Sequence, residues 1–128
     1  MILDSSAIAA IVFKEPGFES LLDRMRAARQ LAIGAPTLTE TGIVLSARLE
    51  RDARGLTARL VQEAMVMVVP FGEAHYATAV DAWLRFGRGR HPAALNFGDC
   101  MSYAVSRLAA QPLLCVGDDF RLTDLLLA

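Results

Sequence analysis

Carboxylates at four separated places in the chain are the side chains best suited to chemistry: Asp4, Glu40, Asp99 and the adjacent pair Asp118 and Asp119. Several carboxylates held close together repel one another, and a bound divalent cation is the usual compensation. Ligands that offer only oxygen favour Mg²⁺ or Mn²⁺. Such ions activate water and neutralise charge on a phosphodiester during in-line displacement, without a serine, histidine or cysteine nucleophile. The acids therefore predict metal-assisted hydrolysis.

The rest of the chain offers few competing catalytic groups. His75 lies at the start of a predicted helix, His91 lies in a predicted loop, and no HExxH, P-loop or GxSxG motif is present. The two cysteines, Cys100 and Cys115, lie in hydrophobic runs without the spacing of a zinc site. We interpret both as reduced core thiols.

Short apolar runs and apolar residues at helical spacing predict the elements that position the acids. The strand candidates are Met1–Leu3, Leu31–Gly34, Met67–Pro70 and Leu113–Val116. The helix candidates are Ala7–Phe13, Phe18–Arg29, Thr37–Arg51, Leu56–Met65, Glu73–Phe86 and Phe97–Ala109. In the fifth of these helices we expect Val80, Trp83 and Leu84 to be buried. Strands separated by one or two helices indicate an α/β fold with a mostly parallel sheet, because parallel neighbours need crossover connections of this length.

In such a sheet the acids fall at one edge. Asp4 follows the first strand, Glu40 opens the helix after the second, and Asp118 and Asp119 follow the fourth. Asp99 lies at the amino end of a helix that runs antiparallel to the fourth strand, so it points to the same edge. Open α/β sheets bind ligands at the carboxyl ends of their strands. We therefore expect the acids to converge there.

Each acid also has a simpler interpretation as a helix cap. Asp4 can cap the first helix, Thr37 to Glu40 has the spacing of a capping box, and Asp99 lies in the first turn of its helix. Glu40 fits this alternative least well, because it shares a helical face with Ile43, Val44 and Ala47. On that face we expect its carboxylate to point toward the apolar side, where burial without a partner or a metal is costly.

Composition predicts a single globular domain over residues 1–128. The chain has 54% hydrophobic residues and a formal net charge of −1, with no basic region before an apolar segment at its start and no apolar run long enough to cross a membrane. We expect a soluble, cytoplasmic protein. A net charge near zero gives no general attraction to nucleic acid, so any affinity for nucleic acid must be local.

The loop from Gly87 to Asn96 is the predicted substrate-binding segment. It carries Arg88, Arg90 and His91 in an irregular, glycine-containing stretch that leads to Asp99, and Arg85 lies just before it. We expect a flexible loop whose cations hold phosphates beside the acids. The alternative is an ordinary solvated basic loop.

With these residues in place, the chain resembles the PIN-domain family, and the VapC toxins within it, over nearly its whole length. The matching pieces are MILDSSA, TLTETGIVL, NFGDCMSYA and LLCVGDDFRLTD. No single piece is specific, but their order and spacing in a chain of this size carry the resemblance. It implies an α/β/α three-layer sandwich with a four- or five-stranded sheet, use of Mg²⁺ or Mn²⁺, endoribonuclease activity as a toxin, a homodimer and neutralisation by a cognate VapB-like antitoxin.

The resemblance also implies roles for individual residues. Asp4, Glu40 and Asp99 match the three central acids, and Ser6 matches the small hydroxyl residue beside the metal. Many relatives carry two acids separated by one residue before the Phe of the last motif. Here Gly117 occupies the first of those places and Asp119 the second, so Asp119 is the expected fourth acid, with Asp118 as a supporting neighbour. This departure leaves open whether one or two metal ions bind.

Two other functions compete with a nuclease. A receiver domain also places aspartates at the carboxyl edge of a parallel sheet, but it needs a lysine late in the chain, and the only lysine is Lys14. A non-catalytic interaction module with the PIN fold is the stronger alternative, since a fold does not establish an activity. The presence of all three central acids weighs against it.

Overall fold

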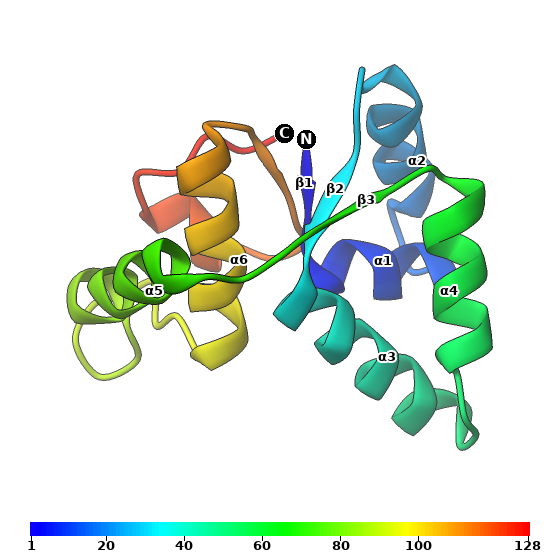
Figure 1. The fold of residues 1–128 in the computed structure, drawn as a ribbon, viewed down its shortest axis with the longest axis horizontal. Coiled ribbons are helices and arrows are strands. Elements are labelled where there is room, and N and C mark those ends of the chain that lie inside the picture. The colour runs from blue at the N-terminus through cyan, green and yellow to red at the C-terminus, as the bar shows by residue number, and fades with distance from the viewer.

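The computed structural model describes all 128 residues, and a sheet of four short strands runs through its centre (Figure 1). The strands are β1 (Ile2–Leu3), β2 (Ala32–Gly34), β3 (Met67–Val69) and β4 (Leu113–Leu114). Their order is β3-β2-β1-β4, and every neighbouring pair is parallel. Helices make the crossovers between strands, as parallel pairing requires. The predicted α/β fold with a parallel sheet is confirmed.

Six α-helices and one short 3₁₀ segment complete the chain: α1 (Ser5–Val12), α2 (Phe18–Ala27), α3 (Ala35–Leu49), α4 (Arg54–Glu63), α5 (Glu73–Phe86), α6 (Phe97–Ala109) and η1 (Asp119–Leu122). The bounds of α5 and α6 agree with the prediction. Helices α1 and α3 each begin two residues earlier than predicted, so that α3 follows β2 directly and only Asp4 separates α1 from β1. None of the helices is long and apolar enough to cross a membrane.

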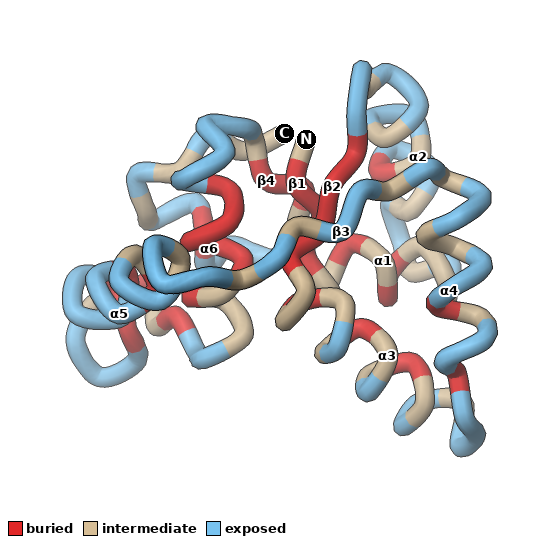
Figure 2. Tube along the Cα trace, viewed as in Figure 1, coloured by how far each residue is buried: buried red, intermediate tan, exposed pale blue.

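Alternate residues of the strands pack on opposite faces of the sheet. Ile2, Ala32 and Leu113 join the larger buried cluster, which α5 and α6 complete. The next residue of each strand, Leu3, Ile33 and Leu114, joins the smaller cluster with α1 and α2. Figure 2 shows the buried residues gathered on the strands and on the helix sides that face them. A sheet buried on both faces is what parallel pairing demands, and it confirms the three-layer sandwich.

The buried face of α5 differs from the prediction. The three large apolar residues expected in the core are exposed by 43% to 50%: Val80, Trp83 and Leu84. The helix instead buries Ala79, Ala82 and Phe86. Small alanine side chains let the axis of α5 approach its neighbour closely, so the contact follows the alanines rather than the largest apolar residues.

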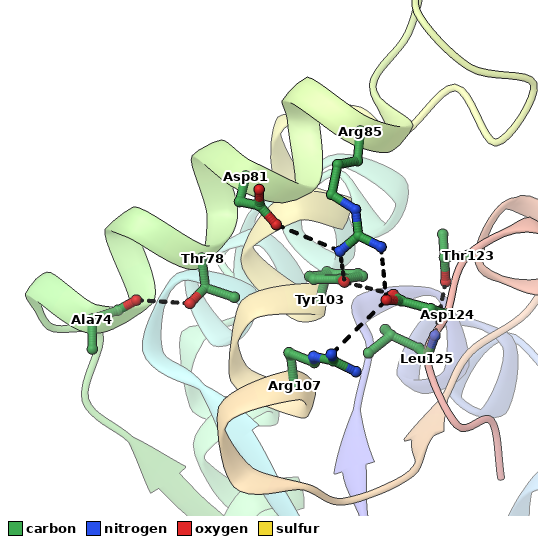
Figure 3. Close-up of polar contacts among 9 residues, drawn as sticks. All are labelled: Ala74, Thr78, Asp81, Arg85, Tyr103, Arg107, Thr123, Asp124 and Leu125. Atoms are coloured by element: carbon green, nitrogen blue, oxygen red, sulfur yellow. Dashed lines mark hydrogen bonds and ion pairs between the residues drawn. The ribbon is translucent and has the colours of Figure 1, made fainter.

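The C-terminal segment is tied to both the sheet and the helices. Leu127 forms a parallel bridge with Leu113, next to β4. Asp124 accepts a hydrogen bond of 2.6 Å from the Tyr103 hydroxyl and pairs with the Arg85 guanidinium at 2.8 Å, as Figure 3 shows. These two donors hold the pKa of the Asp124 carboxyl below its ordinary value. Arg85 therefore joins α5 to the C-terminal segment, and its help in RNA binding stays a prediction.

Candidate active site

Asp4, directly after β1, carries the most buried carboxylate of the predicted site, with 4% of the residue exposed. Its Oδ2 accepts hydrogen bonds from the Ser6 amide at 3.0 Å and from the Ser6 hydroxyl at 2.5 Å. Its Oδ1 accepts from the Ser102 hydroxyl at 2.6 Å. The Ser6 hydroxyl in turn accepts from the Val116 amide, after β4. Asp4 is thus both the cap of α1 and the centre of a buried polar network, so capping and a site role coexist.

Glu40, in the second turn of α3, faces the amino end of α6. Its Oε2 accepts a hydrogen bond of 2.9 Å from the Ser5 hydroxyl. A Cβ atom added to Gly98 would lie only 2.5 Å from Glu40 Oε1. Glycine at position 98 therefore lets the first turn of α6 approach the carboxylate, where the positive end of the helix dipole favours a negative charge.

Two expectations about Glu40 were wrong. The predicted capping box does not form, because α3 already begins at Ala35 after an N-cap at Gly34. The helix buries Thr37, Thr41 and Leu45, which lie on another face, while Ile43 is 65% exposed. Glu40 therefore points into the space between α3 and α6 rather than toward the apolar core.

Asp99, in the first turn of α6, forms the capping box with Asn96. Its Oδ2 accepts from the Asn96 amide at 2.8 Å, and the Asn96 side chain accepts from the Asp99 amide at 2.9 Å. Burial raises the pKa of Asp99 to about 6, the Asn96 hydrogen bond opposes this rise, and the negative charges of Asp4, Asp119 and Glu40 add to it. No basic side chain contributes to this pKa. The charges of the other predicted acids therefore reach Asp99, and no basic side chain of the protein offsets their effect on its pKa.

Asp119 and Asp118 differ in their surroundings. Both are exposed near the start of η1. The charge of Asp119 raises the pKa of Asp99, whereas Asp118 pairs with Arg121 at 3.4 Å. Asp119 is therefore the better placed of the two to act with Asp99.

The acids are not gathered around one point. No three His, Cys, Asp or Glu side chains lie close enough together to bind one metal ion between them. The acids affect one another through their charges, but their side chains do not form a ligand cluster. Some of these side chains would have to rotate before they could bind a shared cation. The chemistry of the set fits such an ion, because its donors are carboxylate oxygens whose repulsion a divalent cation would relieve.

Sequence reasoning missed Ser102 and the site role of Thr37. The Ser102 hydroxyl lies 2.6 Å from Asp4 Oδ1 and 3.1 Å from Thr37 Oγ1, and both residues are buried. The spacing of Ser102 held a usable signal, since it lies three residues after Asp99 and therefore near the same face of α6.

The loop from Gly87 to Asn96 is more ordered than its composition predicts. Gly87 and Leu95 form a parallel bridge, and Ala93 and Leu95 are fully buried. The His91 ring packs edge-on against Phe86, and its Nδ1 accepts a hydrogen bond from the Ala93 amide. The buried residues anchor the loop, and its expected flexibility stays a prediction. His91 also has a structural role in holding the turn.

The two arginines of this loop remain on the surface. Arg88 is exposed and forms no ion pair. Arg90 donates to the Leu84 carbonyl at 3.1 Å, and its guanidinium lies 4.8 Å from the centre of the Trp83 ring. Neither arginine forms an ion pair with a carboxylate, so the guanidinium groups of both can bind a phosphate.

Replacing Asp99 by Asn should stabilise the protein at pH 7 in metal-free buffer. The folded-state pKa of about 6 lies above the ordinary value of 3.8. The folded protein therefore binds more protons than the unfolded chain between these values, and its stability falls as the pH rises through about 6. Asparagine cannot ionise but keeps the capping acceptor. Because Asp99 is partly exposed, screening by water limits the expected gain to about 1 kcal/mol.

Urea unfolding of both proteins between pH 4 and pH 7 measures this effect. The wild type should lose stability across the interval, while the variant should lose less, so their difference should grow with pH. A constant difference would show that the Asp99 charge is not destabilised in the folded protein.

Comparisons with known proteins agree with this architecture. Residues 1–126 match the family model of the PIN domain. Ribonuclease VapC36 of Mycobacterium tuberculosis is 47% identical over 126 residues, which are 98% of this chain and 91% of that protein.

Two solved structures share the fold at lower identity. The crystal structure of M. tuberculosis VapC20, a sarcin-ricin loop cleaving toxin, has a TM-score of 0.79 and 19% identity over 99% of this chain and 97% of that one. A toxin–antitoxin complex from Klebsiella pneumoniae has a TM-score of 0.68 and 15% identity over 93% and 88%. The match of the family model to almost every residue, together with a relative of such high identity, shows that the chain belongs to the PIN domain family.

Proposed function

We propose that this chain is a Mg²⁺- or Mn²⁺-dependent endoribonuclease and the toxin of a toxin–antitoxin pair. The observation that carries the proposal is the gathering of negative charge on Asp99: the charges of Asp4, Glu40 and Asp119 raise the pKa of Asp99, and no basic side chain lowers it. The names of the relatives as VapC ribonucleases support the activity. Cleavage of RNA by the purified chain with Mn²⁺, and its loss in EDTA, would test the proposal. The alternative is an interaction module that keeps the fold and cleaves nothing.

The metal would be held by Asp4, Glu40, Asp99 and Asp119. When bound, it would lower the pKa of a water molecule and neutralise charge on the scissile phosphate. The remaining roles belong to the chain itself. Asp99 Oδ2 accepts from the Asn96 amide and Glu40 Oε2 from the Ser5 hydroxyl, whereas Asp99 Oδ1 and Glu40 Oε1 accept no hydrogen bond from the chain and could orient the attacking water. Ser6 holds Asp4 in place with two hydrogen bonds.

Arg88 and Arg90 would hold the RNA, with His91 shaping the loop between them and α6. A strongly acidic centre repels a polyanion, and the chain as a whole has a net charge of −1. The substrate therefore needs cations of the protein to hold its phosphates, and the two arginines of the loop, which pair with no carboxylate, offer them.

Replacing Arg88 and Arg90 together by Ala should weaken RNA binding about tenfold and lower the slope of log Kd against log salt by about one to two, because two phosphate contacts are lost. Binding to a fluorescent RNA in EDTA, at several salt concentrations, measures both values without cleavage. The matched control replaces Arg51 and Arg59, which are exposed on the α3–α4 side, by Ala. If both double variants change the slope equally, the loop has no special role.

The proposed toxin would act with two protein partners. A VapB-like antitoxin is supported by the toxin–antitoxin complex among the structures that share the fold. A homodimer is supported by the exposed apolar residues of α5 and by Phe97, which is 79% exposed. Apolar residues grouped in this way commonly mark a surface that a partner covers.

A further inference from the structure

Ser102 is a buried polar residue that joins the helix of Asp99 to the carboxylate of Asp4. Only 1% of Ser102 and 2% of Thr37 are exposed, so their hydroxyls must find partners inside the protein. Ser102 Oγ lies 2.6 Å from Asp4 Oδ1 and 3.1 Å from Thr37 Oγ1. The contact thus links α3, α6 and the end of β1.

The direction of these hydrogen bonds follows from the carboxylate. An ionised carboxylate can only accept, so the single hydroxyl proton of Ser102 is donated to Asp4 Oδ1. Ser102 has no second proton to give, and Thr37 must therefore donate to Ser102. Thr37 in this way fixes the rotation of the Ser102 hydroxyl toward Asp4.

The number of donors around Asp4 limits how it can bind a cation. An ionised carboxylate has about four lone-pair positions, two on each oxygen. The Ser6 amide and hydroxyl occupy both positions on Oδ2, and Ser102 occupies one on Oδ1. One position on Oδ1 is left for a metal.

We propose that Ser102 is a positioning residue that fixes the rotation of the Asp4 carboxylate, so that the one free position on Oδ1 is presented to the metal. The inference rests on the proposed metal-dependent function. It adds to that function the oxygen that Asp4 uses, which Ser6 leaves free, and the residue that orients this oxygen. Because Ser102 lies one turn after Asp99 on α6, the same contact also fixes the position of Asp4 relative to the helix that carries Asp99. Hydrogen bonds to metal ligands commonly change metal affinity 10- to 100-fold.

The test is the Mn²⁺ affinity of the full chain without RNA, measured by calorimetry. Ser102→Ala should raise the Kd for Mn²⁺ about 10- to 100-fold. Thr37→Val, which keeps the shape of the side chain, should raise it by a smaller factor because Ser102 can still donate. The matched control is Ser106→Ala. Ser106 is an equally buried serine of α6, but its hydroxyl donates to the Gln111 carbonyl, so its loss should leave the Mn²⁺ Kd unchanged.

Thermal unfolding of each variant separates affinity from folding. A folded Ser102→Ala protein that binds Mn²⁺ within about twofold of the wild type would overturn the positioning role while leaving the metal site intact. A wild type that binds no Mn²⁺ would overturn the proposed function together with this inference. If Ser102→Ala does not fold, Thr37→Val decides the matter, and an unchanged Kd in that variant contradicts the proposal.

Discussion

Replacing Asp4 or Asp99 by Asn should reduce the rate of RNA cleavage about 100- to 1,000-fold at saturating Mn²⁺. The reason is that a metal ion stabilises the charge of the transition state by several kcal/mol, and each loss of about 1.36 kcal/mol lowers the rate tenfold. The substitution removes a charge and preserves the shape of the side chain. Asparagine keeps one oxygen for the Asn96 amide at position 99, so the capping box can survive. At position 4 the amide nitrogen of asparagine would meet either Ser102 or Ser6, and the stability effect there should be larger.

Single-turnover cleavage of a labelled RNA gives the rate, and circular dichroism shows whether each variant is folded. Asp23→Asn is the matched control, because Asp23 lies on the exposed side of α2, where it pairs only with Arg26. Its rate should equal that of the wild type. Folded Asp99→Asn protein that cleaves at the wild-type rate would mean either that the site is misplaced or that another nuclease contaminates the preparation. Repeating the assay across column fractions distinguishes these two explanations.

The sequence predicts the fold well because its strongest signals are local. Each strand is a short apolar run, and β1, β2 and β4 have both faces buried, so no alternation is needed to recognise them. Helix α6 is bounded at Asn96 by a capping box that the structure contains. In these places propensity, pattern and tertiary structure agree.

The prediction fails where packing between helices decides the outcome. Trp83 is the largest apolar residue of α5, yet it is 43% exposed, while Ala79 and Ala82 are buried. A sequence pattern gives weight to large apolar residues, whereas the distance between two helix axes is set by small ones. The same limit applies to Glu40. Its position on α3 was correct, but its surroundings depend on Gly98 and Ser5, which belong to other elements.

The site shows a similar division between what is local and what is not. Asp4 and Asp99 could be found because each follows or opens an element at a known edge of the sheet. The spacing of Ser102 after Asp99 indicates a shared face of α6, but its contact with Asp4 could not be assigned from the chain alone, because the two residues are 98 positions apart. Its importance comes from burial beside a carboxylate, which only the tertiary structure reveals.

Removing divalent metal with EDTA should abolish cleavage, and adding Mn²⁺ back should restore it. The charges of Asp4, Glu40 and Asp119 raise the pKa of Asp99, and no basic side chain lowers it. Without metal, the phosphate would therefore meet uncompensated negative charge. We expect a fall in rate of at least about 1,000-fold, comparable to the loss from removing the acids themselves. Cleavage of a defined single-stranded RNA, followed by gel electrophoresis, measures it.

The chemical nature of the RNA ends distinguishes the proposed reaction from its main alternative. Attack by water on phosphorus leaves a 5′-phosphate and a 3′-hydroxyl, whereas attack by the RNA's own 2′-hydroxyl leaves a 2′,3′-cyclic phosphate. The second route commonly uses a general base such as histidine. Here the Nδ1 of His91 is engaged with the Ala93 amide and that of His75 with the Gly72 amide, so neither is well placed for this role. Mass spectrometry of the products should therefore show only 5′-phosphate and 3′-hydroxyl ends. Cyclic phosphate, or cleavage that persists in EDTA and in Asp99→Asn, would exclude hydrolysis by the acids.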